Sequence, residues 1–202
     1  MSVRNSQHTA GGQQGFTLIE ALIAFVVLTV GILGIISLIV MSKNSLHESA
    51  QRNLAVSIAD AMVERIRIDP TAVATYNLGT APLGGGKRSK PAKDCTLVIC
   101  TPTEMATYDL WAWEQALDGN TVVVGGNNTG GLISPQACIT FTAQNGLVRS
   151  GLLNVTIQWR GLAKSKDAVL AGGVACGGAA AGQDPYRRQV AVNTIVLDEA
   201  EF

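Results

Sequence analysis

The 202-residue sequence predicts an α+β fold, in which one long N-terminal helix packs on a small antiparallel sheet of three to four strands. Three observations lead to this prediction. An apolar run near the N-terminus continues into a stretch whose apolar residues recur at a helical period. A second segment with helix-capping signals follows it. The C-terminal part then contains runs in which apolar and polar residues alternate, as is typical of strands.

Composition narrows the classes of function. Lysine plus arginine and aspartate plus glutamate both total 15, so the net charge gives no reason to expect a nucleic-acid partner. Only 5% of the residues are aromatic and 22 residues are glycine, so a core built on large rings is excluded. The length allows one compact domain plus additional segments.

The first element is an apolar run that is long enough to cross a membrane. Residues 21–41 contain 21 positions without a charge, and a spanning helix needs about 20. A secretory signal peptide has a shorter apolar core, of about 7–15 residues, followed by a small-residue cleavage site. We therefore expect one transmembrane segment, residues 16–42, in which Gly31 and Gly34 let neighbouring helices approach closely.

A short motif precedes this run. A polar leader, residues 1–15, ends in glycine, and the chain continues Gly15-Phe16-Thr17-Leu18-Ile19-Glu20. This motif closely resembles the class III signal of type IV pilins and type II secretion pseudopilins. The resemblance implies the type IV pilin fold, removal of residues 1–15 by a prepilin peptidase that cuts after Gly15, and N-methylation of Phe16. It also implies three further partners, which are the N-methyltransferase, the inner membrane, and other minor and major pilins that pack through the N-terminal helix.

Glu20 is the one charged residue of this apolar block. Cleavage would leave a charged amine on Phe16, and a buried amine needs a partner carboxylate. Glu20 lies one helical turn along the chain and can meet the amine of a neighbouring subunit, so we expect it to serve assembly. The alternative is that Glu20 only marks the edge of the membrane.

The helix is expected to continue beyond the membrane, over residues 43–69. Apolar residues recur there every four positions, which predicts one buried face. They are Leu46, Ala50, Leu54, Ile58, Met62 and Ile66. The pattern stops at Asp69-Pro70, so the helix from Phe16 to Ile68 would contain 53 residues and measure about 80 Å.

The end of this helix carries a narrower resemblance. The stretch Asn53–Pro70 is similar to the corresponding juncture of PilV-type minor pilins, and so is Asp109–Trp113, which reads Asp-Leu-x-x-Trp. The matching residues of the first stretch are Leu54, Ala55, Asp60, Met62, Glu64, Arg65, Arg67, Asp69 and Pro70. The resemblance implies a minor pilin that helps initiate or prime a type IV pilus. Two alternatives stay open: a type II secretion pseudopilin, and an adhesin or DNA-uptake minor pilin displayed on the fibre.

The remaining residues, 70–202, are expected to form a glycine-rich head outside the cytoplasm. The run Gly84–Arg88 lacks the spacing and the Ser or Thr of a phosphate loop. A basic cluster that begins within this run is interpreted as a solvated loop rather than as a nucleic-acid contact. The cluster contains Lys87, Arg88, Lys90 and Lys93.

A second helix is predicted after this loop. Thr101 and Glu104 form a capping box, Pro102 occupies the first turn, and Gly119 ends the helix. The expected buried face consists of Ala106, Leu110, Trp113 and Leu117.

Three alternating runs, residues 137–143, 152–159 and 187–197, predict antiparallel strands with one apolar face. The turn Gln144–Gly146 would join the first two strands. A weak run at residues 121–124 would add a fourth strand to the same sheet.

All four cysteines follow the apolar run, in an oxidising compartment if the head is exported. Three pairings are possible. We favour Cys95–Cys100 as a local loop and Cys138–Cys176 as the closure of a glycine-rich excursion over residues 162–184, while the crossed pairings stay open. Only one short cysteine spacing exists and both histidines lie elsewhere, so no metal site is expected.

No catalytic residue or cofactor is predicted. His47 has no nucleophile at a recognisable elbow, and Asp109 and Glu114 are interpreted as solvated residues of a capped helix. The chain is expected to be a substrate of processing enzymes. It would be a single-pass protein of the bacterial inner membrane with its head in the periplasm, later incorporated in the pilus.

Overall fold

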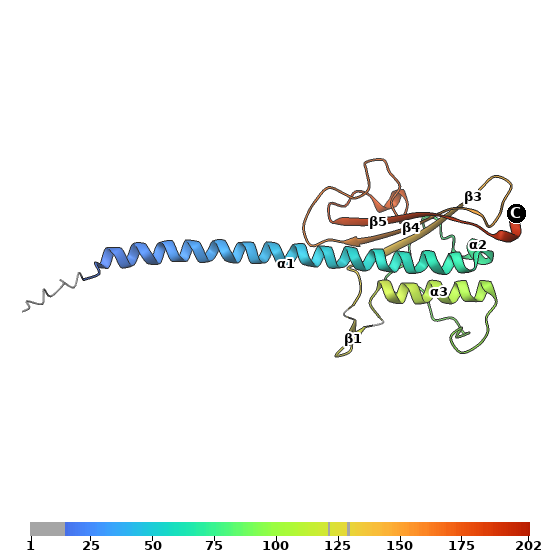
Figure 1. The fold of residues 1–202 in the computed structure, drawn as a ribbon, viewed down its shortest axis with the longest axis horizontal. Coiled ribbons are helices and arrows are strands. Elements are labelled where there is room, and N and C mark those ends of the chain that lie inside the picture. The colour runs from blue at the N-terminus through green and yellow to red at the C-terminus, as the bar shows by residue number, and fades with distance from the viewer. Residues whose placement is uncertain (1–14, 121, 129) are drawn as a thin grey trace, which may run out of the picture. The chain divides into compact units, whose positions relative to one another are not determined.

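The computed structural model describes residues 15–120, 122–128 and 130–202. Contacts divide the chain into two units, Met1–Ser45 and Leu46–Phe202, and each is considered by itself. A long N-terminal helix precedes a shorter helix and a three-stranded antiparallel sheet (Figure 1), so the predicted α+β class is confirmed. Apart from Gly15, the expected leader lies outside the described residues.

Helix α1 runs from Leu18 to Ile68. In the first unit two of its hydroxyl side chains bond to the backbone of the preceding turn. Thr29 donates to the carbonyl of Val26 (2.8 Å), and Ser37 donates to the carbonyl of Leu33 (3.1 Å). These polar side chains are therefore satisfied without water, as a lipid environment requires.

In the second unit α1 buries one face against the head. Its buried residues are Ala55, Ile58, Ala59, Met62, Val63 and Ile66. The predicted stripe is therefore right from Ile58 onward, but it is wrong at Leu46 and Ala50, which are exposed. A strict four-residue repeat drifts by about 40° per step around a helix of 3.6 residues per turn, so its first members face away from the core.

Helix α1 ends where the sequence predicts a stop. The side chain of Asp69 accepts a hydrogen bond from the backbone N–H of Thr71 (3.1 Å) and caps the 3-10 turn η1 (Pro70–Ala72). The short helix α2 (Val73–Tyr76) follows directly. The chain therefore leaves the course of α1 at Asp69 and continues through η1 and α2.

Helix α3 (Pro102–Leu117) has the predicted capping box. The hydroxyl of Thr101 accepts a hydrogen bond from the N–H of Glu104 (3.4 Å), and the Glu104 carboxylate accepts one from the N–H of Thr101 (2.9 Å). The predicted buried face is confirmed.

Strands β3 (Gln136–Ala143), β4 (Gly151–Arg160) and β5 (Arg187–Val196) form one antiparallel sheet with β4 in the centre. The register pairs Ile139 with Val155. The predicted apolar face of β4 is confirmed, because alternate side chains are buried: Leu153, Val155, Ile157 and Trp159. A short 3-10 turn precedes β5, η2 (Ala179–Ala181), and another follows it, η3 (Glu199–Glu201).

The fourth strand was placed wrongly by the sequence pattern. Strand β1 (Val123–Val124) pairs with β2 (Asn127–Asn128) in a separate two-stranded sheet, and residue 121 lies outside the described residues. Gly125 and Gly126 both have positive φ, of 60° and 83°. Such a two-residue turn pairs β1 with the segment that follows it at once, so β1 does not join the larger sheet.

The core of the head brings the three layers together. Figure 1 shows the second half of α1 between α3 and the sheet, and the buried cluster contains residues of each, such as Met62, Leu110 and Val155. The indole Nε1 of Trp113 donates to the backbone carbonyl of Ile58 (3.0 Å). This bond fixes α3 on α1 within the second unit.

Candidate assembly site

The residues for which the sequence predicts processing and assembly lie just before α1 and in its first turn. Gly15, Phe16 and Thr17 precede the helix without regular structure. The Thr17 carbonyl accepts hydrogen bonds from the N–H groups of Glu20 (3.1 Å) and Ala21 (3.2 Å), which close the first turn. Glu20 therefore lies where the partial positive charge of a helix N-terminus favours a carboxylate.

The helix of the first unit is covered by no other part of that unit that the structure describes. Its large apolar side chains between Leu18 and Met41 are 46–87% exposed. By length and composition, α1 is the one helix among the described residues that can cross a membrane. Lipid or the apolar helices of other subunits can cover such a surface.

Gly31 and Gly34 are open on this helix. A Cβ atom at either position would meet no atom within 4 Å. Neither glycine is therefore required for packing within the first unit. A close helix–helix approach at these positions would have to involve a second subunit.

The two stretches from which a minor pilin was predicted, Asn53–Pro70 and Asp109–Trp113, contact each other. Arg65 of α1 forms an ion pair with Asp109 of α3, and the Tyr76 hydroxyl donates to the same carboxylate (2.7 Å). Burial, followed by the hydrogen bond to Asp109, raises the pKa of Tyr76 well above its usual value. The phenol therefore remains a neutral donor, and Asp109 joins α1, α2 and α3.

Asp109 and Glu114 were predicted to be solvated, and this interpretation is wrong, because both are buried. The carboxylate of Glu114 accepts three backbone hydrogen bonds, from Gly84 (3.0 Å), Lys87 (2.9 Å) and Arg88 (2.7 Å). Glycine-rich turns present backbone N–H groups to anions in this way. The sequence contained one indication of this contact. The three glycines before Lys87 form a turn whose backbone N–H groups can bind a carboxylate.

Asp118, at the end of α3, continues this arrangement. Its two carboxylate oxygens accept hydrogen bonds from the N–H groups of Gly85 and Gly86, each of 2.8 Å. Together with Glu114 it holds the loop 84–88 by its backbone. We call these two carboxylates the acid cradle.

Glu48 anchors the start of the head half of α1, a role that the sequence did not reveal. Its carboxylate accepts hydrogen bonds from the N–H of Leu162 (2.9 Å) and from Nε of Arg188 (3.1 Å). A Cβ on Gly161 would clash with the Glu48 carboxylate. The partners lie 114 and 140 residues away, and no local pattern indicates contacts at such separations.

Two disulfides close loops of the head. Cys95 is bonded to Cys100, and Cys138 is bonded to Cys176; the Cα–Cα distance is 5.6 Å in each. The second bond is buried and ties β3 to the excursion that follows β4. Among the residues that the structure describes, no three His, Cys, Asp or Glu side chains gather to hold a metal ion.

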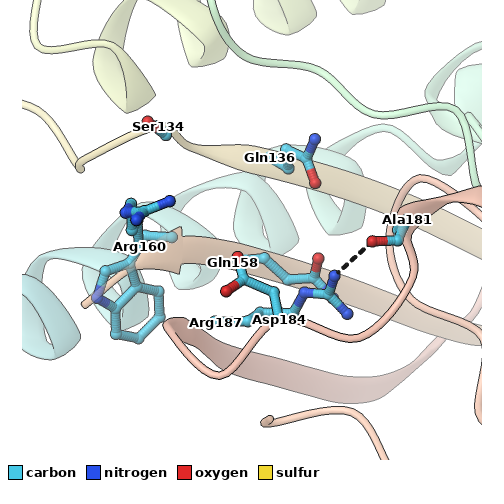
Figure 2. A pocket seen from close by; sticks show the side chains of 8 residues that line it. Ser134, Gln136, Gln158, Arg160, Ala181, Asp184 and Arg187 are labelled. Carbon is cyan, nitrogen blue, oxygen red and sulfur yellow. Dashed lines mark hydrogen bonds between the residues drawn. The ribbon is translucent and has the colours of Figure 1, made fainter. Parts of the chain in front are cut away.

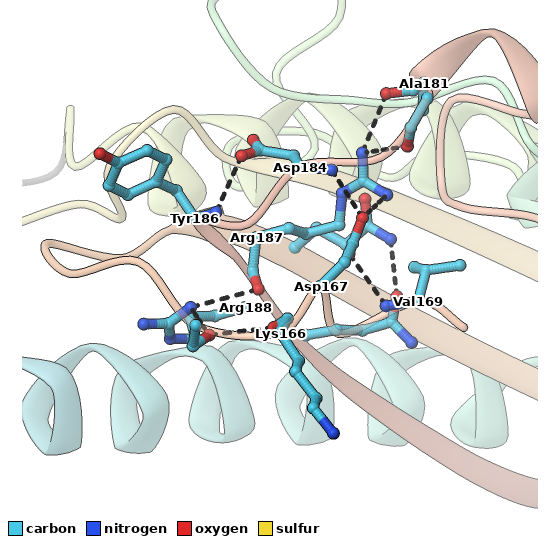
Figure 3. Close-up of polar contacts among 12 residues, drawn as sticks. Lys166, Asp167, Val169, Ala181, Asp184, Tyr186, Arg187 and Arg188 are labelled. Atoms are coloured by element: carbon cyan, nitrogen blue, oxygen red, sulfur yellow. Dashed lines mark hydrogen bonds and ion pairs between the residues drawn. The ribbon is translucent and has the colours of Figure 1, made fainter. Parts of the chain in front are cut away.

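A polar cavity of about 220 Å³ lies where this excursion meets the sheet, lined among others by Gln136, Gln158, Arg160 and Arg187 (Figure 2). Figure 3 shows the network behind it, in which Asp167 pairs with Arg187 at 3.4 Å and accepts a hydrogen bond from the N–H of Asp184 (2.7 Å). Burial alone would raise the pKa of Asp167, but its hydrogen bonds and Arg187 lower it. Arg187 also donates to the backbone carbonyls of Ala181 and Gly182, each at 3.0 Å. The network therefore holds the excursion on the sheet.

Two family models match the chain. One, described as a prokaryotic N-terminal methylation motif, matches residues 11–41, and one described as type IV pilin Tt1218 matches residues 38–111. No match is found among curated proteins or among solved structures. The matched residues contain the Gly15–Glu20 motif, all of α1 and the first part of α3. Proteins of this family are structural rather than enzymatic. These two matches support a type IV pilin-like prepilin.

Proposed function

We propose that this chain is a minor pilin that helps initiate or prime assembly of a type IV pilus. The observation that carries the proposal is the uncovered apolar surface of α1 in the first unit, with the single charge of Glu20 in its first turn. A helix of this kind has to be covered by lipid or by other helices. A prepilin that moves from the membrane into a fibre exchanges the first cover for the second.

Processing precedes assembly in this proposal. Prepilin peptidase removes residues 1–15 by cutting after Gly15, and the new terminus at Phe16 is N-methylated. Residues 16–42 then lie in the inner membrane, residues 43–69 continue the helix, and residues 70–202 form the head in the periplasm. Two disulfides in the head fit an oxidising compartment.

Glu20 supplies a contact between subunits during assembly, because its carboxylate pairs with the amine of Phe16 in an adjacent subunit. The amine of Phe16 carries a positive charge at a helix terminus that is already partly positive. Packing among neighbouring helices would bury this amine, and Glu20 of an adjacent subunit offsets the charge. Gly31 and Gly34, which are open within the first unit, let the adjacent helix approach.

The head favours a minor pilin over a secretion pseudopilin. The stretches Asn53–Pro70 and Asp109–Trp113, which resemble PilV-type minor pilins, are in contact through Arg65–Asp109 and Trp113–Ile58. The two stretches thus belong to one structural unit of the head. This contact supports the assignment to the pilus.

A deletion of the gene, with complementation as the control, tests the proposal. We expect few or no surface fibres in the deletion strain. We also expect the chain at far lower abundance than the major pilin in sheared wild-type fibres, measured by quantitative mass spectrometry. Normal fibres with a defect in type II secretion would favour the pseudopilin, and normal fibres with defective attachment or DNA uptake would favour the displayed minor pilin. Either result would contradict a priming role.

A further inference from the structure

The loop closed by Cys95 and Cys100 carries three consecutive apolar side chains into solvent. The exposed fraction is 81% for Leu97, 50% for Val98 and 96% for Ile99. Single exposed apolar residues are ordinary on protein surfaces, whereas a contiguous group at the end of a loop indicates an interaction. We call these three residues the apolar tip.

The conformation of the loop keeps the apolar tip exposed. The N–H groups of Leu97 and Val98 both donate to the carbonyl of Asp94, at 3.0 and 3.1 Å. The carboxylate of Asp94 accepts hydrogen bonds from the N–H (3.1 Å) and the hydroxyl (2.6 Å) of Thr96. These bonds and the disulfide fix the turn, so the tip cannot fold back onto the head without breaking them.

A cationic hollow of about 530 Å³ lies along the segment that precedes the tip in the chain. It is lined by Lys87, Arg88, Lys90 and the ring of Trp111, among others. The Nζ atom of Lys90 binds the Asp94 carboxylate at 3.0 Å and lies 5.5 Å from the centroid of the Trp111 ring. Asp94 therefore connects the cationic hollow to the apolar tip.

The two cations at the start of the hollow are available to a ligand. The acid cradle holds Lys87 and Arg88 by their backbone N–H groups. Within the described part of the chain, neither side chain forms an ion pair. Between Lys87 and Cys100 there are four cations, of which Lys90 and Lys93 pair with Asp94 and Glu104. Lys87 and Arg88 are therefore the two cations of this segment whose charge no ion pair among the described residues offsets.

We propose that the apolar tip and the cationic hollow together dock onto an anionic lipid membrane. Anionic headgroups attract clustered Lys and Arg, and apolar side chains are stabilised at the boundary of the acyl chains. A Trp ring beside the cations suits the interface between these two regions. A nucleic acid would use the cations and the ring but would leave the tip in water. The inference goes beyond the assembly role and does not depend on the position of the chain in a fibre.

Vesicle capture by the full processed chain tests this proposal. The protein, with its helix embedded in an immobilised phosphatidylcholine nanodisc, is exposed to vesicles of phosphatidylcholine alone or with added phosphatidylglycerol. We expect capture of the anionic vesicles, weakened by salt. Ile99→Ser should reduce capture several-fold, and Lys87→Gln and Arg88→Gln should each reduce it about fivefold. Leu170→Ser, at a side chain 83% exposed elsewhere on the head, is the matched control and should behave as wild type.

The same experiment shows what would overturn the proposal. Equal capture of both kinds of vesicle would show that the surface has no preference for an anionic membrane. Undiminished capture by Ile99→Ser would show that the apolar tip does not contribute to membrane binding. Either result would overturn the proposal. A DNA oligonucleotide that binds wild type and Ile99→Ser equally, without vesicle capture, would assign the hollow to nucleic acid. Fibre counts should be unchanged in Ile99→Ser. A loss of fibres with normal capture would place the tip against another pilin, whereas failed capture with normal fibres leaves the assembly role intact.

Discussion

The hydroxyl of Tyr76 donates a 2.7 Å hydrogen bond to the carboxylate of Asp109, and both residues are buried. Arg65 approaches the same carboxylate from the surface, with half of its side chain exposed. One acid therefore links the end of α1 to α2 and to α3. Removing this acid would be costly, because it would leave a buried donor without its acceptor.

Asp109→Ala should destabilise the head. It leaves the buried Tyr76 hydroxyl without its acceptor, and we expect a loss of about 1–3 kcal/mol in the free energy of unfolding. Denaturant unfolding of the detergent-solubilised chain, followed by tryptophan fluorescence, measures this loss. Asp60→Ala, at an exposed position of α1, is the control and should change stability by no more than about 0.5 kcal/mol. Equal effects of the two variants would contradict the role of Asp109.

Glu20→Ala should separate assembly from insertion. Removing a carboxylate from an apolar helix favours insertion, so the variant should enter the membrane and still be cut after Gly15. In the fibre the Phe16 amine would lack its partner, at a cost of about 3–5 kcal/mol for a fully buried pair. That cost corresponds to roughly a hundredfold or more in an assembly equilibrium.

Cell fractionation and a count of surface fibres measure this outcome. Processed Glu20→Ala protein should accumulate in the inner membrane while fibres become fewer. Glu20→Asp should be partly defective, because the charge remains but its reach is shorter. Normal incorporation of Glu20→Ala into sheared fibres would show that assembly does not require this carboxylate.

Processing should produce a defined N-terminus. Mass spectrometry of the membrane-bound protein should find a chain that begins at N-methylated Phe16. Gly15→Val should block the cut, because a branched side chain crowds the scissile bond. An intact Met1 in the wild-type protein, or a cut after Met41, would rule out this processing site.

Stability in acid should depend on Glu104. Its hydrogen bond with the Lys93 ammonium (2.7 Å), assisted by the backbone N–H of Thr101, lowers its pKa from 4.5 to about 2. The folded-state pKa lies below the unfolded value, so this stabilisation is present above about pH 4.5 and is lost as the pH falls through 2. Unfolding curves of wild type and Glu104→Gln should therefore converge as the pH falls over this window. A difference that stays constant with pH would contradict the assignment.

Peptide mapping without reduction should recover the two bonds Cys95–Cys100 and Cys138–Cys176. In the chain-entropy model the longer loop, with a sequence separation of 38, contributes about 4 kcal/mol and the shorter one about 2 kcal/mol. Cys138→Ala/Cys176→Ala should therefore destabilise the head more than Cys95→Ala/Cys100→Ala does. A Cys95–Cys138 link, or four free thiols, would refute this pairing.

The elements that sequence predicted well are those with a local signal. The capping box at Thr101 and Glu104 involves neighbours in the chain, and the alternation along β4 reflects one buried and one exposed face. The break at Asp69-Pro70 is likewise a local backbone effect. The motif Gly15–Glu20 is also a local pattern, which is why the family could be identified from so few residues.

The contacts that sequence could not predict join distant segments. Glu48 meets Arg188 only because the fold brings α1 to β5, and a carboxylate on a helix looks solvated until its partners are known. The same applies to Glu114, whose three partners are backbone N–H groups that carry no side-chain signal. Periodicity also gave a wrong prediction at Leu46. The four-residue repeat placed it on the buried face, but this position of the helix faces away from the core.

The acid cradle has a consequence for how this head can evolve. Glu114 and Asp118 hold the loop 84–88 through main-chain groups, which every residue except proline provides. Lys87 and Arg88 can therefore be exchanged for other residues without loss of the anchor, whereas Gly84 is fixed because a Cβ there would collide with the carbonyl of Pro135. Related heads that keep the glycine and the two acids can differ freely in the charge of this surface, so a lineage can change what the surface recognises by single substitutions while the scaffold stays the same.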